Sequence, residues 1–255
     1  MTLPGPLNPA PVTRLSINVN KLALLRNSRG RNFPDVAAFS ERFLGLGAGG
    51  ITLHPRPDQR HARYADVAAL KAVVRRHPGA ELNVEGNPCE EFLDVVVRER
   101  PDQCTLVPDE PGQLTSDHGW DLAGNAARLR GIVARLRDAG VRTSLFVDWD
   151  NPDLAIARDL GAERVELYTE PYAAGHGDAG SERVLEGFRA AAARARDAGL
   201  GVNAGHDLNL ENLARFLTIP SILEVSIGHA LIVECVESGI GEVMTRYLRI
   251  VRAAA

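Results

Sequence analysis

The chain has 255 residues, 45% of them hydrophobic and 24% charged, which are the proportions of a globular protein with a sizeable core. Its formal net charge of −4 provides no general basic field, so binding to nucleic acid or to an anionic membrane surface is not expected. The three cysteines form no CxxC pair, which argues against a disulfide framework or a structural zinc site and favours a reducing, cytoplasmic location.

Four prolines lie within residues 1–14, which are expected to form an extension before a single domain over residues 15–255. No secretion signal and no apolar run long enough to cross a membrane are recognisable in the sequence.

Short β-branched segments alternate with segments of helical periodicity from Leu15 to the C-terminus. The predicted strands are Leu15–Asn20, Gly50–His54, Glu81–Glu85, Gln103–Val107, Thr143–Asp148, Arg164–Tyr168, Gly201–Ala204 and Leu223–Ile227. The predicted helices are Asp35–Leu46, Tyr64–His77, Glu90–Arg98, Leu122–Ala139, Pro152–Leu160, Glu182–Ala198, Leu210–Phe216 and Ala230–Ala253. Several strands are nearly continuous hydrophobic runs, which is typical of parallel strands covered on both faces.

Eight such units predict a closed α/β barrel of the (β/α)8 type, a TIM barrel. A doubly wound open sheet is the alternative, but the GxGxxG fingerprint with which such a sheet binds a dinucleotide is absent after the first strand. Two long loops, Asp109–Asp121 and Ala173–Gly180, are predicted on one face, the second as a mobile lid.

The C-terminal ends of the strands, where such barrels form their active sites, are strongly polar. The residues there are Asn18, Asn20, Lys21, His54, Arg56, Glu85, Asp148, Glu166, His206, Gly228 and His229. Histidines and a glutamate converging on one mouth suit repeated proton transfers near neutral pH. A zinc centre is the competing use, although the His-x-His pair that such centres usually have on the first strand is here Asn18-Val19-Asn20.

Arginines cluster after the first two strands, where their planar guanidinium groups match phosphate oxygens. They are Arg26, Arg29, Arg31, Arg56, Arg60 and Arg63, with His61 among them. The ends of strands seven and eight add backbone N–H groups where barrels commonly bind a phosphate. Two anion sites facing one acid/base cluster predict an enzyme that joins two phosphorylated molecules. The alternatives are loop-capping hydrogen bonds for single strand-end residues and a solvated loop for Arg31 and Arg60.

Eight segments together carry a resemblance to a known family. They are LSINVNKLALLRNSRG, GGITLHPRPDQRH, ELNVEGN, LVPDEPGQLTSDHGWDLAG, SLFVDWD, VELYTEPYA, VNAGHDLN and SIGHALI. In their order and spacing the chain resembles the pyridoxine 5′-phosphate synthases of deoxyxylulose-dependent vitamin B6 synthesis. The resemblance implies a (β/α)8 barrel, commonly a homo-octamer, that condenses 3-amino-2-oxopropyl phosphate with 1-deoxy-D-xylulose 5-phosphate. It implies no redox cofactor and no essential metal.

The resemblance also implies roles for single residues. The proton acceptors would be His54 and Glu85, and the proton donor would be His206. The aminoketone phosphate would be bound by Asn18, Arg29, Gly228 and His229, and the deoxyxylulose phosphate by Arg56, His61 and Thr115. Glu166 matches a further carboxylate of the site. Asn20, Lys21 and Asp207, which replace Asp, His and Gly of the family's pattern, are expected among the substrate-binding residues.

Two of these replacements leave alternatives open. Lys21 is expected to act electrostatically, as a phosphate clamp or proton donor, while a Schiff base with a ketone substrate is the covalent alternative. Asp207 either weakens a backbone contact to phosphate through its negative charge or caps the following helix.

Two other functions compete with the synthase. One is a different phosphosugar barrel enzyme, an isomerase, epimerase or aldolase. The other is a catalytically silent barrel that binds phosphorylated metabolites, against which the presence of His54, Glu85 and His206 argues.

Overall fold

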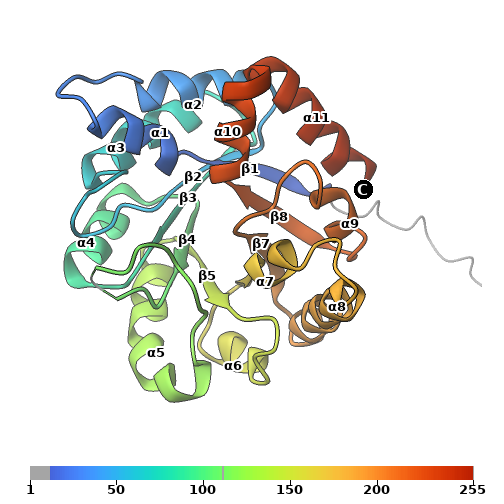
Figure 1. Ribbon diagram of the computed structural model, residues 1–255. Helices are drawn as coiled ribbons and strands as arrows, with labels where there is room; N and C mark the ends of the chain where they lie inside the picture. Colours follow the sequence, from blue (N-terminus) through green and yellow to red (C-terminus); the bar gives the residue numbers. More distant parts are fainter. Residues whose placement is uncertain (1–11, 111, 255) are drawn as a thin grey trace, which may run out of the picture.

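A computed structural model describes residues 12–110 and 112–254 and shows a closed barrel of eight parallel strands in sequence order, with helices outside (Figure 1). The strands are β1 (Arg14–Asn18), β2 (Gly50–Leu53), β3 (Glu81–Gly86), β4 (Gln103–Leu106), β5 (Arg142–Val147), β6 (Arg164–Tyr168), β7 (Gly201–Gly205) and β8 (Ile222–Ile227). The barrel closes through β1 and β8, where Leu15 lies opposite Val225. The predicted (β/α)8 fold is confirmed. Residues 1–11 of the predicted extension lie outside the described residues.

The helices cover the outer face of this barrel. They are α1 (Asn20–Asn27), α2 (Val36–Gly45), α3 (Tyr64–Val74), α4 (Glu90–Glu99), α5 (Leu122–Asp138), α6 (Leu154–Asp159), α7 (Glu170–Ala174), α8 (Ser181–Asp197), α9 (Leu213–Phe216), α10 (His229–Ser238) and α11 (Ile240–Ala253). Each presents an apolar stripe to the strands, as α3 does with the buried Val67, Leu70 and Val74. Within the part of the chain that the structure describes, no helix has the length and apolar character needed to cross a membrane.

The structure corrects the sequence prediction at three helices. Strand β1 ends at Asn18, and Asn20 begins the unpredicted helix α1 because the Asn18 side chain accepts the Asn20 N–H at 3.1 Å. The short α7 was not predicted; it begins at Glu170 and ends at Ala174, within the expected loop Ala173–Gly180. The long predicted C-terminal helix is two helices, since Gly239 at φ +84° takes a left-handed conformation that stops α10.

The inside of the barrel is polar toward the N-terminal ends of its strands. Gln103 on β4 donates to Glu224 on the opposite strand β8 at 3.3 Å, and Arg164 on β6 donates to Asn203 on β7 at 3.1 Å. Apolar residues of the barrel strands, such as Val84 on β3, are fully buried in the hydrophobic core. The barrel interior can thus hold the buried Glu224 carboxyl group, which accepts a hydrogen bond from the Gln103 amide.

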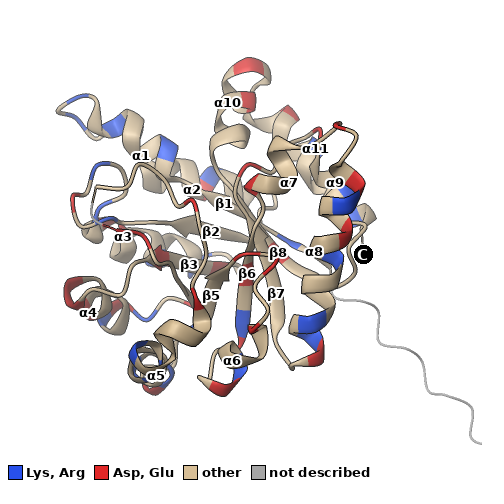
Figure 2. Cartoon of the chain, turned by 60° about the horizontal axis from the view of Figure 1, so that its bottom comes forward, with Lys and Arg blue, Asp and Glu red and all other residues tan. Residues whose placement is uncertain are grey.

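Two arginine-rich loops, one after α1 and one before α3, lie on the same side of the molecule (Figure 2). Asn27 at the end of α1 joins them, because its Nδ2 donates to the carbonyl of His61 at 2.7 Å. Arg26 is buried and forms a bidentate ion pair with Asp66, with distances of 2.7 and 2.9 Å. Arg26 thus braces the two loops and is not free to bind phosphate.

Candidate active site

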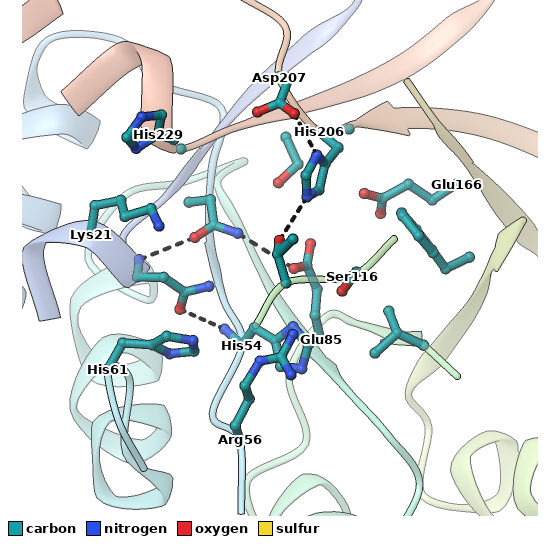
Figure 3. A pocket seen from close by; sticks show the side chains of 18 of the residues that line it. Lys21, His54, Arg56, His61, Glu85, Ser116, Glu166, His206, Asp207 and His229 are labelled. Atoms are coloured by element: carbon teal, nitrogen blue, oxygen red, sulfur yellow. Dashed lines mark hydrogen bonds and ion pairs between the residues drawn. The ribbon is translucent and has the colours of Figure 1, made fainter. Parts of the chain in front are cut away.

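A cavity of about 420 Å³ opens at the C-terminal ends of the strands (Figure 3). It is lined by all of the predicted site residues except Arg29. Those lining it are Asn18, Asn20, Lys21, His54, Arg56, His61, Glu85, Thr115, Glu166, His206, Asp207, Gly228 and His229. The strand-end pattern in the sequence therefore located the cavity.

His54 follows β2 directly and is buried, with only 6% of its surface exposed. Burial, with the positive charge of Arg56 and the nearby His61, lowers the pKa of His54 well below its ordinary value of 6.5. Its backbone N–H donates to Asn20 Oδ1 at 2.9 Å, which ties the end of β2 to the start of α1. His54 is consequently an uncharged imidazole at neutral pH, able to accept a proton.

Glu85 projects from β3 into the same cavity and is also buried. Burial and the neighbouring carboxylates of Glu166 and Glu224 raise the pKa of Glu85 well above its ordinary value of 4.5. Its two oxygens accept long hydrogen bonds of 3.4 Å from the amides of Asn18 and Asn83. These amides orient the carboxyl group without the full positive charge that would hold it ionised.

Glu166 on β6 is the second buried carboxyl group of the cavity. Burial and the Glu224 carboxylate raise the pKa of Glu166 to about 8, while a hydrogen bond of 3.3 Å from Thr105 Oγ1 acts in the opposite direction. The carboxyl group packs against Gly205, where any Cβ would collide with Glu166 Oε1. Glycine at this position therefore leaves the Glu166 carboxyl group the place it occupies.

His206 lies on the turn that follows β7. Its Nε2 is 3.0 Å from Thr115 Oγ1 and its Nδ1 is 2.9 Å from Asp207 Oδ2 (Figure 3). The ring also packs edge-on against Tyr168, with centroids 5.1 Å apart. Asp207 thus pairs with the neighbouring histidine, and its carboxylate does not cap the following helix, which was one of the two alternatives.

Arg56 is buried and forms an ion pair with Asp109 on the loop after β4. Ser116 Oγ donates to the same Asp109 Oδ2 at 2.8 Å, and Arg56 Nη1 donates to the carbonyl of Gln113 at 2.9 Å. Asp109 Oδ2 also lies 3.9 Å from His54 Nε2. This loop therefore closes one wall of the cavity and brings Thr115 to it.

Sequence reasoning missed Asp109 and Ser116. Both lie within a segment that was recognised as a long polar loop, and an acidic residue two positions after a predicted strand end is the signal that could have found Asp109. Arg56, the ion-pair partner of Asp109, lies 53 residues away from it in the chain, so no local pattern links the two.

His61 and Lys21 form the wall nearest to the arginine-rich loops. Burial is the main cause that lowers the pKa of His61 to about 4, and the charges of Arg56 and Lys21 add to it. His61 Nδ1 accepts the Ala62 N–H at 2.9 Å, which leaves Nε2 as the N–H donor of a neutral ring. This side of the cavity carries fixed cations and N–H donors that fit a phosphate group.

Arg29 is exposed and lines a different concavity, an apolar groove between α1, α2 and α10. Its neighbours there include Leu25, Phe33 and Val236, which are exposed apolar side chains. Asp148 also lies away from the cavity lining, where its carboxylate accepts the Gly119 N–H at 3.0 Å and anchors the loop after β4.

Comparison with known proteins shows the family of the chain. A model of the family described as pyridoxal phosphate biosynthesis protein PdxJ matches residues 15–253. The chain belongs to the PdxJ family. A pyridoxine 5′-phosphate synthase of Xanthomonas campestris pv. campestris (strain B100) is 51% identical over 251 residues, which cover 95% of this chain and 98% of the relative. The synthase of Albidiferax ferrireducens is 48% identical over 243 residues, covering 93% of this chain and 96% of that relative.

Solved structures share the barrel of this PdxJ-family chain at much lower identity. Thiamine phosphate pyrophosphorylase from Pyrococcus furiosus aligns with a TM-score of 0.62 at 14% identity, over 95% of this chain and 96% of that one. Phosphoribosyl anthranilate isomerase from Thermus thermophilus aligns with a TM-score of 0.54 at 16% identity, over 93% of this chain and 100% of that one. Such likeness shows the fold alone.

Proposed function

We propose that this PdxJ-family enzyme is a pyridoxine 5′-phosphate synthase that condenses 3-amino-2-oxopropyl phosphate with 1-deoxy-D-xylulose 5-phosphate to pyridoxine 5′-phosphate, phosphate and water. The observation that carries the proposal is the convergence of a buried neutral histidine with two buried carboxyl groups of raised pKa in one cavity. Groups whose proton affinities are moved apart by their surroundings are typical of general acid/base catalysis.

The chemistry requires a proton transfer at each stage. The substrate amine and ketone form an imine, phosphate leaves, water adds, and ring closure with dehydration yields the aromatic ring. His54 and Glu85 would accept protons, His206 would donate one, and Glu166 would serve as a further carboxyl group of the site. None of these steps calls for a redox cofactor or a metal.

The two phosphate groups would bind on opposite sides of the cavity. Asn18, Gly228 and His229 would bind the aminoketone phosphate at the start of α10, where backbone N–H groups are free and the helix dipole is favourable to an anion. Gly228 packs closely against Asn18, since a Cβ at Gly228 would lie 3.0 Å from Asn18 Cβ, and this supports a phosphate site that the two residues share. Arg56, His61 and Thr115 would bind the deoxyxylulose phosphate.

The residues that depart from the family's pattern would assist this binding. Lys21 would act through its charge beside the deoxyxylulose phosphate, with no covalent adduct. Treatment with borohydride in the presence of the ketone substrate should then leave Lys21 unmodified. Asn20 would hold the end of β2 in place through its hydrogen bond to the His54 N–H.

Self-association to a homo-octamer in the cytoplasm is part of the proposal. Support comes from the apolar groove of about 480 Å³ that Leu25, Phe33 and Val236 line on the outside of the barrel. Arg29 lies at this groove and not at the active-site cavity. To bind the aminoketone phosphate, the loop that carries Arg29 must therefore reach the cavity of the same chain or that of a neighbouring copy. Light scattering on the purified protein tests the assembly.

The decisive experiment supplies both substrates to the purified protein without added metal or nicotinamide and follows pyridoxine 5′-phosphate and released phosphate. Product with both substrates, and none when either is omitted, is the expected result. A folded protein that yields no product would favour a different phosphosugar isomerase, epimerase or aldolase.

Substitution of the acid/base residues tests their roles. His54→Asn and His206→Asn should each lower turnover by about 100-fold, since general acid/base groups contribute on that order. His77→Asn, at an exposed ion pair with Glu41 after α3, is the matched control and should leave turnover unchanged. Normal turnover in the His54 or His206 variant would remove that residue from the mechanism.

A further inference from the structure

The turn that carries His206 has an unusual backbone. His206 and Asp207 both have positive φ angles, of 93° and 60°, which residues other than glycine seldom adopt. The turn is fixed from both sides, because Thr169 Oγ1 donates to the Gly205 carbonyl at 2.7 Å and Asn212 Nδ2 donates to the Asp207 carbonyl at 3.2 Å. A side chain at residue 207 is thus kept where glycine would fit the backbone more easily.

The Asp207 side chain determines which ring nitrogen of His206 carries a proton. An ionised carboxylate can only accept hydrogen bonds, so His206 Nδ1, at 2.9 Å from Asp207 Oδ2, must be the donor. The hydrogen bond from His206 is the main cause that lowers the pKa of Asp207, so the carboxylate is ionised at neutral pH. Nε2 is then the nitrogen that faces the cavity, 3.0 Å from Thr115 Oγ1.

We propose that Asp207 is a positioning residue for His206: its carboxylate accepts the Nδ1–H and fixes the orientation of the ring, so that Nε2 is the nitrogen directed at the substrate. In the transfer, the Nε2–H bond breaks, its proton passes to the substrate oxygen, and the neutral ring keeps its Nδ1–H toward Asp207. The inference rests on the proposed function, because it presupposes that His206 donates a proton there. It replaces the expectation that Asp207 binds substrate directly.

Charged and titratable groups from several elements act on this pair. Lys21 on α1 and His229 on α10 both lower the pKa of Asp207, as cations do. Tyr168 on β6 contacts the His206 ring, and Glu170, Asp117 and Asp148 act in turn on Tyr168. Glu166 lies beneath Gly205 in a protonated state at neutral pH. The Asp207 carboxylate thus interacts with the Lys21 cation as well as with the His206 ring.

Two variants separate the carboxylate from the backbone. Asp207→Asn keeps the shape and tolerates a positive φ, and Asp207→Gly relaxes the backbone while it removes the side chain. Both should lower kcat by about 10-fold, because neither variant keeps an anionic acceptor that holds the Nδ1–H and fixes the ring. Asp138→Asn, at an exposed position at the end of α5, should leave kcat unchanged.

A rise in KM with an unchanged kcat would overturn the inference and return Asp207 to direct substrate binding. In a His206→Asn background the Asp207→Asn substitution should have no further effect on kcat, and additive losses would also contradict the inference.

Nitrogen-15 NMR of the histidine-labelled protein without substrate separates this inference from the proposed function. His206, assigned by the loss of its signal in His206→Asn, should carry its proton on Nδ1 in the wild type and shift toward Nε2–H in Asp207→Gly. An Nε2–H ring in the wild type would refute the role of Asp207, whatever reaction the enzyme catalyses. The expected tautomer in a protein that makes no pyridoxine 5′-phosphate would instead refute the proposed reaction alone.

Discussion

Replacing Glu166 by glutamine should stabilise the barrel by an amount that grows with pH. Because the pKa of Glu166 is raised from 4.5 to about 8, the folded protein retains a proton that the unfolded chain releases. Its contribution to stability is fully present below pH 4.5 and is lost as the pH rises toward 8. Between pH 4.5 and pH 7 the free energy of unfolding falls by about 1.4 kcal/mol per pH unit, so the loss at pH 7 is about 3 kcal/mol.

Glutamine has the shape of the protonated carboxyl group, stays neutral at every pH, and can keep the hydrogen bond from Thr105. Urea denaturation followed by circular dichroism, at one protein concentration, should therefore show Glu166→Gln more stable by about 3 kcal/mol at pH 7 and by under about 1 kcal/mol at pH 5. Glu211→Gln, on an exposed loop, is the control and should show no such change with pH. An equal difference at pH 5 and pH 7 would mean that Glu166 is ionised in the folded protein, and the reasoning would fail.

Three further predictions concern the cavity. If Glu85 must be ionised to accept a proton, its raised pKa makes kcat/KM increase with pH above the range in which an ordinary carboxyl group titrates, and Glu85→Gln should lower turnover by about 100-fold at every pH. Asp109→Asn should reduce kcat/KM for the deoxyxylulose phosphate by about 10-fold or more, because it weakens the ion pair that fixes the loop after β4; an unchanged steady-state value would contradict this. Gly205→Ala should destabilise the fold by about 1–3 kcal/mol in urea denaturation, since its Cβ would meet Glu166, whereas Gly241→Ala in open space at the start of α11 should not.

The sequence was sufficient to predict the fold because parallel barrel strands are buried on both faces and appear as short apolar runs. The predicted strand Arg164–Tyr168 matches β6 at both ends. The first strand was predicted to end two residues too late, at Asn20 instead of Asn18. Asn20 looks like a strand end in the sequence, but its N–H donates to the Asn18 side chain and it begins a helix. Gly239 divides α10 from α11 through a conformation that apolar periodicity does not encode.

The candidate site was predicted as far as chain position determines it. Strand ends meet at one mouth, so His54, Glu85 and Glu166 could be placed together without a structure. The contacts that tune these residues could not be predicted, because they depend on burial and on long-range partners. Glu224 is an example: it lies on β8, 58 residues after Glu166 in the sequence, yet it is the carboxylate that adds to the raised pKa of Glu166.

Burial raises the pKa of the carboxyl groups of this cavity and lowers the pKa of its histidine. Both shifts suit a site that receives two anionic substrates. Desolvation disfavours charge of either sign, so it raises the pKa of Glu85 and of Glu166 while it lowers the pKa of His54. The charged forms of these groups are thereby disfavoured before substrate arrives, which reduces the negative charge that would oppose a phosphate. The cations that remain, among them Lys21, line the cavity wall. A site with two exposed, ionised carboxylates would instead repel both phosphate groups, and this explains why the carboxyl groups project from strands inside the barrel and the cations from the loops and helix that surround it.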